Sequence, residues 1–241
     1  MVAAVAGAGG WAWYRATHST PVGLAAAVGE FRGDHVTAGA MGPGLPAAGV
    51  YTYRATGWER ANMGPVHLSR NVPAQGQDVV TPSPGGFTSE LRLSGEHLES
   101  NRYRMRDGAL WVTWQRTNVT FLGVGRDDKR TLKPAVLAVP RTPRPGMHWD
   151  VSHTSWLLHI TGTARVEGTA SLTVDGRDVP VVIIRTDTVT KGAHGGPLHQ
   201  RMWWAPSLGL PVRVVTDTTL SGVVGYRSHI ELWLNATQPA R

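Results

Sequence analysis

The sequence predicts an all-β fold: one large curved antiparallel sheet, half-barrel-like, after an N-terminal apolar helix and a linker. From residue 49 onward, apolar and polar residues alternate, as in 50–56, which is the period of a half-buried strand. Turn dipeptides such as Asp107-Gly108 and Asp175-Gly176 separate short strand candidates. No ten-residue helical pattern lies between these candidates, which argues against a parallel sheet and favours an antiparallel one that curves or closes.

Strand candidates fall into two halves. In the first half they are 50–56, 90–94, 103–106, 110–115 and 118–122. In the second half they are 156–165, 169–174, 179–188, 198–204, 210–219 and 223–234. The proline-rich stretch 134–145 is interpreted as a long connection between the halves, because neither half looks self-sufficient.

Composition limits the classes of function. The hydrophobic fraction of 41% and the ten tryptophans suffice for a sizeable core. The net charge of +7 would suit an anionic partner, but the arginines are dispersed, and the densest run, 102–106, alternates like a solvated strand face. The chain has no cysteine, which excludes disulfides, thiolate metal sites and thiol nucleophiles.

The N-terminal segment resembles part of a membrane anchor. Residues 2–14 carry no charge and end in Trp11, Trp13 and Tyr14, a cluster that a membrane interface favours. The run is shorter than the ~20 residues of a spanning helix, and no basic region precedes it as in a signal peptide. We interpret 1–15 as a truncated membrane anchor or a signal remnant; an apolar start packed on the domain is the alternative.

Four segments are predicted. They are the anchor or signal remnant 1–15, a flexible linker 16–47 with a short helix at 22–31, a single β-rich domain 48–235 and a disordered tail 236–241. Arg15 and Arg32 alone favour a cytoplasmic domain, while missing upstream basic residues would reverse that orientation. We place the protein at the cell membrane with its domain on the extracytoplasmic side.

Catalytic and metal motifs are weak. His194 and His199 flank a Gly-Gly-Pro turn, but no acidic residue stands at the helical spacing of zinc enzymes. The pattern Gly-x-Ser-x-Gly is absent, and the pair Ser152-His153 lacks a strand-turn-helix setting. Other candidates are ordinary loop or strand residues: His148, His159, Asp127-Asp128 and Gly123-Val124-Gly125. We therefore predict no catalytic residue, no metal site and no cofactor, with a hydrolase-type enzyme as the least favoured alternative.

Tryptophans are the candidate ligand-binding residues. Interleaved aromatic and basic residues at 201–204 could stack on nucleic-acid bases, but adjacent strand residues face opposite sides, so Trp203 and Trp204 cannot both line one groove. We predict no nucleic-acid partner. The ligand-binding wall is predicted at Trp111, Trp114, Trp156, Trp203 and Trp204.

The second half resembles a known class. It holds Arg144-Pro145-Gly146-Met147-His148-Trp149, then 174–180 (VDGRDVP), then 203–213 (WWAPSLGLPVR). This order resembles uncharacterised bacterial envelope proteins similar to the lipoprotein-carrier (LolA-like) half-barrel class, over about residues 144–234. The resemblance implies a curved sheet and transfers no catalytic residue.

The leading functional hypothesis is a non-enzymatic envelope protein, membrane-anchored or secreted, that binds a lipid or other apolar ligand on its sheet. The alternative is a structural or assembly module that binds a membrane-protein partner and has no ligand cavity. Both hypotheses connect the protein to the membrane through its N-terminus.

Overall fold

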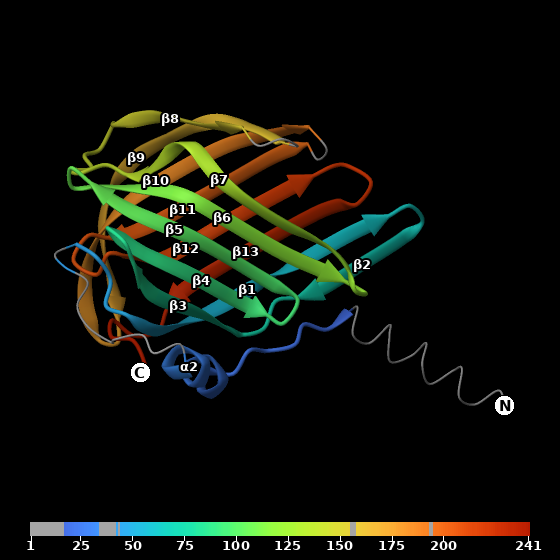
Figure 1. Ribbon diagram of the computed structural model, residues 1–241, viewed down its shortest axis with the longest axis horizontal. Coiled ribbons are helices and arrows are strands. Elements are labelled where there is room, and N and C mark those ends of the chain that lie inside the picture. The colour runs from blue at the N-terminus through green and yellow to red at the C-terminus, as the bar shows by residue number, and fades with distance from the viewer. Residues whose placement is uncertain (1–16, 34–41, 43, 155–157, 193–194) are drawn as a thin grey trace.

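The alternating pattern produces one antiparallel sheet of thirteen strands in the residues that the computed structural model describes, which are 17–33, 42, 44–154, 158–192 and 195–241. The sheet rolls into a nearly closed barrel (Figure 1). The all-β, antiparallel prediction is confirmed, and the curvature continues well beyond a half-barrel. Both Asp-Gly turns form as predicted, with positive φ at Asp107, Gly108, Asp175 and Gly176.

Most strands pair with their neighbours in sequence. The first seven are β1 (Gly49–Met63), β2 (Val66–Asn71), β3 (Gln75–Ser83), β4 (Gly86–Ser94), β5 (His97–Arg106), β6 (Ala109–Phe121) and β7 (Val124–Val139). The others are β8 (His148–Thr154), β9 (Leu158–Val174), β10 (Arg177–Gly192), β11 (Gly196–Ala205), β12 (Leu210–Leu220) and β13 (Gly225–Leu234). Their order is β7-β6-β5-β4-β3-β1-β13-β12-β11-β10-β9-β8, with β2 paired to β1. The pairing of β1 with β13 joins the two halves of the chain.

The barrel closes between its two terminal strands, β7 and β8, at a junction that we call the seam. No backbone ladder joins β7 to β8 in the described part of the chain. A side-chain bond crosses instead: the Trp149 indole Nε1 donates to the Leu137 carbonyl oxygen at 2.9 Å. The seam is therefore the one junction around the described sheet that depends on side chains.

The proline-rich stretch corrects our expectation of a connection at 134–145. Strand β7 continues through Pro134 to Val139, and the connection to β8 begins only after it. Register shifts between Val112 and Trp114 leave the chain around Pro134 outside the ladder with β6. A proline is tolerated here because β7 is a terminal strand with a bulge, where no ladder donor is required.

Segments expected to be a linker and a tail pack on the barrel. Helix α2 (Leu24–Gly33) buries Ala27 and Phe31 against the outer side of the sheet, in a cluster with Val50 and Val79. The tail at 236–241, expected to be disordered, pairs with β1 through two backbone bonds between Val50 and Ala240, each 2.9 Å long. Figure 1 shows α2 close to the C-terminus.

The barrel interior holds the main core. Alternate residues of β1, including Tyr51, Tyr53 and Ala55, are buried there with residues of β10 to β13. No described helix is long and apolar enough to cross a membrane. The anchor predicted at 1–15 lies outside the described residues.

Candidate ligand cavity inside the barrel

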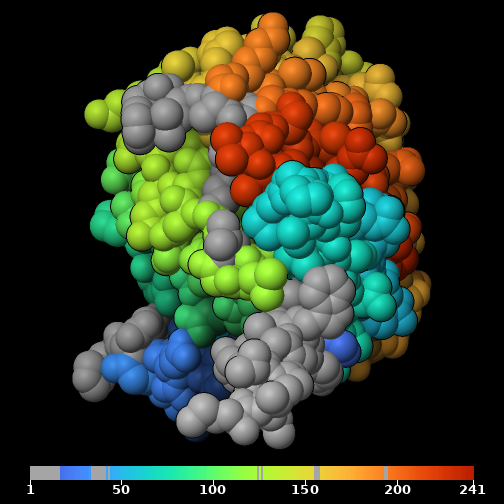
Figure 2. All heavy atoms as spheres, turned by 90° about the vertical axis from the view of Figure 1, so that its right-hand side faces the viewer, coloured from blue at the N-terminus to red at the C-terminus, as the bar shows by residue number. Residues whose placement is uncertain are grey.

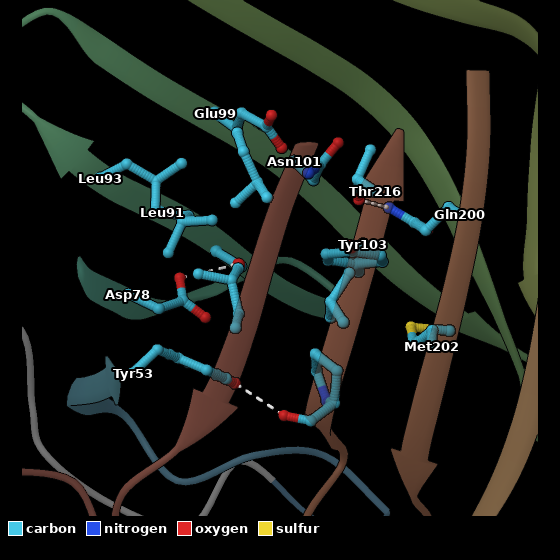
Figure 3. A pocket seen from close by; sticks show the side chains of 15 residues that line it. Tyr53, Asp78, Leu91, Leu93, Glu99, Asn101, Tyr103, Gln200, Met202 and Thr216 are labelled. Carbon is cyan, nitrogen blue, oxygen red and sulfur yellow. Dashed lines mark hydrogen bonds between the residues drawn. The ribbon is translucent and has the colours of Figure 1, made fainter. Parts of the chain in front are cut away.

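A cavity of about 120 Å³ lies in the barrel interior. Its walls come from β1, β3, β4 and β5 on one side and from β11, β12 and β13 on the other (Figure 3). The apolar part of the lining is Leu91, Leu93, Met202, Pro211, Val214, Ile230 and Leu232. The polar part is Tyr53, Asp78, Ser89, Glu99, Asn101, Tyr103, Gln200 and Thr216.

Strand periodicity explains which side chains reach the cavity. Glu99, Asn101 and Tyr103 are alternate residues of β5, so they share its inner face. Gln200 and Met202 have the same relation on β11. The Gln200 amide nitrogen lies 3.4 Å from the Thr216 hydroxyl oxygen, which fixes the amide against its neighbouring strand.

Asp78 is the buried acid of this cavity. Its side chain is 4% exposed, and its Oδ1 accepts a hydrogen bond from the Ser89 hydroxyl at 2.8 Å. Burial raises the pKa of this carboxyl to about 6, and the nearby charge of Glu90 adds to that effect. The Ser89 bond acts in the opposite direction, because it stabilises the carboxylate.

Two tyrosines stiffen the walls beside Asp78. The Tyr53 hydroxyl donates to the Pro211 carbonyl oxygen at 2.8 Å, which links β1 to β12 across the interior. The Tyr103 ring stacks on Phe87 with 4.8 Å between centroids. Burial raises the pKa of both hydroxyls, so both remain protonated at neutral pH.

A buried ion cluster adjoins the cavity. Glu59, which is fully buried, accepts hydrogen bonds from Arg70 Nε at 2.7 Å, from His97 Nδ1 at 2.7 Å and from the Tyr226 hydroxyl at 2.8 Å. The other His97 nitrogen, Nε2, lies 3.2 Å from Oε1 of Glu99. Glu99 therefore belongs to both the ion cluster and the cavity lining.

Both central groups of the ion cluster are charged at neutral pH. Burial alone would raise the pKa of Glu59, but the His97 bond and the charges of His97 and Arg70 lower it to about 2. Burial alone would lower the pKa of His97, but its bonds to Glu59 and Glu99 raise it to about 9. The cluster is a structural set of ion pairs, since each buried charge has an opposite charge beside it.

The predicted tryptophans lie elsewhere. Trp114 lies under the exposed Arg102, with 5.7 Å from guanidinium to ring centroid, and Trp111 pairs in register with the exposed Arg104. The Arg213 guanidinium lies 4.4 Å from the centroid of the buried Trp203 ring. Trp204 is buried in the main core, and Trp156 lies outside the described residues. None of the four described tryptophans lines the cavity, and their role in ligand binding stays a prediction.

Histidines considered as metal ligands are separated from one another. His199 Nδ1 bonds to Asp187 at 2.6 Å on the exterior, and His194 lies outside the described residues. His153 is buried near the seam, where burial and the charge of Arg130 lower its pKa to about 4. Among the residues with described positions, no group of three or more potential ligands is placed to hold a metal ion.

Comparisons with known proteins assign no family to this chain. No protein-family model matches the chain, and no curated protein matches it. One solved structure with a likeness is the hypothetical lipoprotein YmcC from Escherichia coli K12, at 14% identity and a TM-score of 0.35. The alignment covers 78% of this chain and 85% of that one. At this level of similarity we transfer no function from it.

Asp78, Glu59 and His97 are site residues that sequence reasoning missed. Asp78 lies in a strand whose burial does not alternate, and His97 begins an inner face that continues with the polar Glu99 and Asn101. The available signal was the alternation itself: Glu59 falls on the same face as Tyr53 and Ala55, where an apolar residue is expected. Charged residues that occupy core positions are candidates for buried networks.

Proposed function

We propose that the barrel interior binds a small ligand that is largely apolar, and that the protein is a binding protein of the cell envelope and not an enzyme. The cavity carries this proposal. Ligand sites are mostly apolar concavities with a few polar groups that fix orientation, and this lining has that mixture. An assembly module without a ligand cavity has less support, because the interior is not filled.

The volume of the cavity limits the size of the ligand. Apolar cavities of about 150 Å³ accept a molecule such as benzene. A space of about 120 Å³ accordingly suits a small ring or a short alkyl chain with its head group, and a whole phospholipid requires the walls to move apart. The possible ligands thus narrow from lipids in general to small amphiphiles or to one end of a larger amphiphile.

Paired substitutions on β12 test the cavity. Val214 lines it, while Val215 is the next residue on the strand and does not. We expect Val214→Phe to abolish binding of 1-hexanol to the full chain, measured by NMR chemical-shift titration, and Val215→Phe to preserve it. Circular dichroism confirms that both variants fold. Unchanged hexanol binding in folded Val214→Phe places the ligand elsewhere.

We also propose that one end of the barrel faces a membrane. The turns β1–β2, β6–β7 and β12–β13 meet at this end, which Figure 2 shows face-on. Each turn carries an exposed aliphatic residue: Val66 is 39% exposed, Leu122 44% and Val223 93%. The chain enters the fold at the same end, because Thr20 bonds to Glu96 in the β4–β5 turn.

A dye at single introduced cysteines tests this orientation, since the chain has no cysteine of its own. Val223→Cys places a polarity-sensitive dye at the proposed membrane end. Met147→Cys, at a residue 39% exposed in the β7–β8 connection, is the matched control at the opposite end. With phosphatidylglycerol–phosphatidylethanolamine vesicles we expect a blue shift of the dye at 223 and none at 147. Equal responses contradict the orientation.

A further inference from the structure

We propose that the ligand of the interior cavity carries a positively charged primary amine, which Asp78 binds as an ion pair. This inference rests on the proposed function and specifies the chemical class of the ligand. It follows from two observations: the sign of the charges that line the cavity, and the absence of a cationic partner for Asp78 among the described residues.

The ionisable lining is entirely acidic in character. Asp78 and Glu99 are its two carboxyls, and Tyr53 and Tyr103 contribute neutral phenols. No lysine, arginine or histidine is among the described residues that line the cavity. At Asp78, a carboxylate or phosphate head would meet like charge without a cation in the lining to offset it, whereas an ammonium group would meet an opposite charge.

Asp78 lacks the compensation that buried carboxylates in this fold otherwise have. Glu59, equally buried, is held by both Arg70 and His97. Asp78 has a hydroxyl partner, Ser89, and no cation in the described structure is placed to pair with it. A buried carboxyl without a cation destabilises the folded protein, and such costs are typical of functional sites.

Glu99 lies two strands from Asp78 on the same wall, because Leu91 of β4 pairs in register with both residues. One of its oxygens is bound by His97 at 3.2 Å, and its side chain is 41% exposed, so it is less desolvated than Asp78. Asp78, Glu99 and Asn101 project from β3 and β5, whereas Met202 projects from β11 across the cavity (Figure 3). An amine head at Asp78 leaves its alkyl chain against Leu91 on the same wall and Met202 on the opposite one.

The charge on Asp78 makes the amine binding dependent on pH. The titratable groups around it are Glu90, Glu99, Tyr51, Tyr53 and Tyr103, and the three phenols stay neutral in the range considered. As the pH falls through the pKa of Asp78, its carboxyl takes up a proton and the ion pair is lost. An alkyl ammonium group, like a lysine, remains charged throughout. Amine binding therefore weakens in acid, while binding of a neutral alcohol does not.

Three probes with one chain length decide between head groups: hexylamine, 1-hexanol and hexanoate, each titrated into the full chain and followed by NMR at about pH 7. We expect hexylamine to bind at least about tenfold more tightly than hexanoate, because a hydrogen-bonded ion pair replaces a repulsion. If none of the three binds, the proposed function itself is wrong. If hexanol binds and hexylamine binds no better than hexanoate, the function stands and the amine inference is overturned.

The variant Asp78→Asn isolates the contribution of the charge on Asp78 to binding. An asparagine oxygen can still accept the Ser89 bond, so the wall is preserved while the charge is removed. We expect this variant to lose about tenfold in hexylamine affinity and to change hexanol affinity by less than about threefold. Asp178→Asn, on an exposed residue of β10, is the matched control and should leave both affinities unchanged. Equal hexylamine affinity in Asp78→Asn and the unmodified protein overturns the assignment.

Discussion

Replacing His97 by glutamine tests whether the buried ion cluster contributes to stability through the charge of the imidazole. In the unmodified protein the pKa of His97 rises from 6.5 to about 9 on folding, because Glu59 and Glu99 bind its charged form. The folded state thus holds a proton that the unfolded state loses as the pH rises. This contribution is fully present below pH 6.5 and is lost as the pH rises through about 9.

The size of the effect follows from the same two values. A tenfold difference in proton affinity is worth about 1.4 kcal/mol. The rise from 6.5 to about 9 therefore corresponds to a loss of about 3 kcal/mol in the free energy of unfolding across that range. His97 is 2% exposed, so solvent screens this interaction little. Asp78 and His153 titrate below this window in the folded state, with pKa values of about 6 and about 4.

Urea unfolding at a series of pH values between 6.5 and 9 measures the effect. We expect His97→Gln to be less stable by about 3 kcal/mol at the acid end of the window and to show almost no further loss toward the alkaline end. His229→Gln is the control: this histidine is exposed and pairs with Asp217, so its loss should cost under about 1 kcal/mol and leave the pH slope intact. A slope in His97→Gln equal to that of the unmodified protein would refute the reasoning.

Three further predictions concern other parts of the fold. Asp78→Asn should raise the free energy of unfolding at pH 7 by up to about 3 kcal/mol. The reason is that the folded pKa of Asp78, about 6, lies above the unfolded value of 3.8, so ionisation of this carboxyl opposes folding. Urea unfolding at a series of pH values checks this, and the gain in stability should vanish in acid. Trp149→Phe removes the hydrogen bond to Leu137 across the seam. We expect the free energy of unfolding to fall by about 1 kcal/mol and amide hydrogen exchange along β7 to become faster. Unchanged exchange along β7 would contradict this role of the bond. Gly57→Ala places a Cβ 1.9 Å from a carbonyl oxygen of β13, at a residue with φ of +130°. Thermal unfolding should therefore show a free energy of unfolding lower by at least about 3 kcal/mol. Gly168→Ala is the control and should be tolerated, because nothing lies within 4 Å of the added Cβ.

Sequence periodicity identified the fold class because each strand carries its own alternation. The strands of the second half, such as β12 at Leu210–Leu220, lie close to where the pattern placed them. Closure was not predictable in the same way. It depends on the pairing of β1 with β13, which are far apart in the chain, and on side-chain contacts at the seam such as the indole bond of Trp149. Neither kind of contact leaves a local pattern in the sequence.

The faces of the sheet on which the tryptophans lie depend on bulges in the strands. Trp111 and Trp114 are three residues apart, so a regular strand would place them on opposite faces. A bulge between Val112 and Trp114 shifts the period, and both pair in register with exposed arginines. Trp203 and Trp204 likewise flank a register shift. Bulges cannot be located from alternation alone, and the side of the sheet that a residue faces depends on them.

Comparison of Glu59 with Asp78 gives the strongest physical reason to connect this fold with ligand binding. Both carboxyls lie inside one barrel and are almost completely removed from water. Glu59 has two cationic partners and its pKa falls to about 2, whereas Asp78 has a serine and its pKa rises to about 6. The fold is therefore able to supply cationic partners to a buried carboxylate. It does so at Glu59, which lies beside the cavity, but not at Asp78, which lines it. Since an uncompensated acid lowers stability, a cation supplied from outside the chain is the partner that this position lacks.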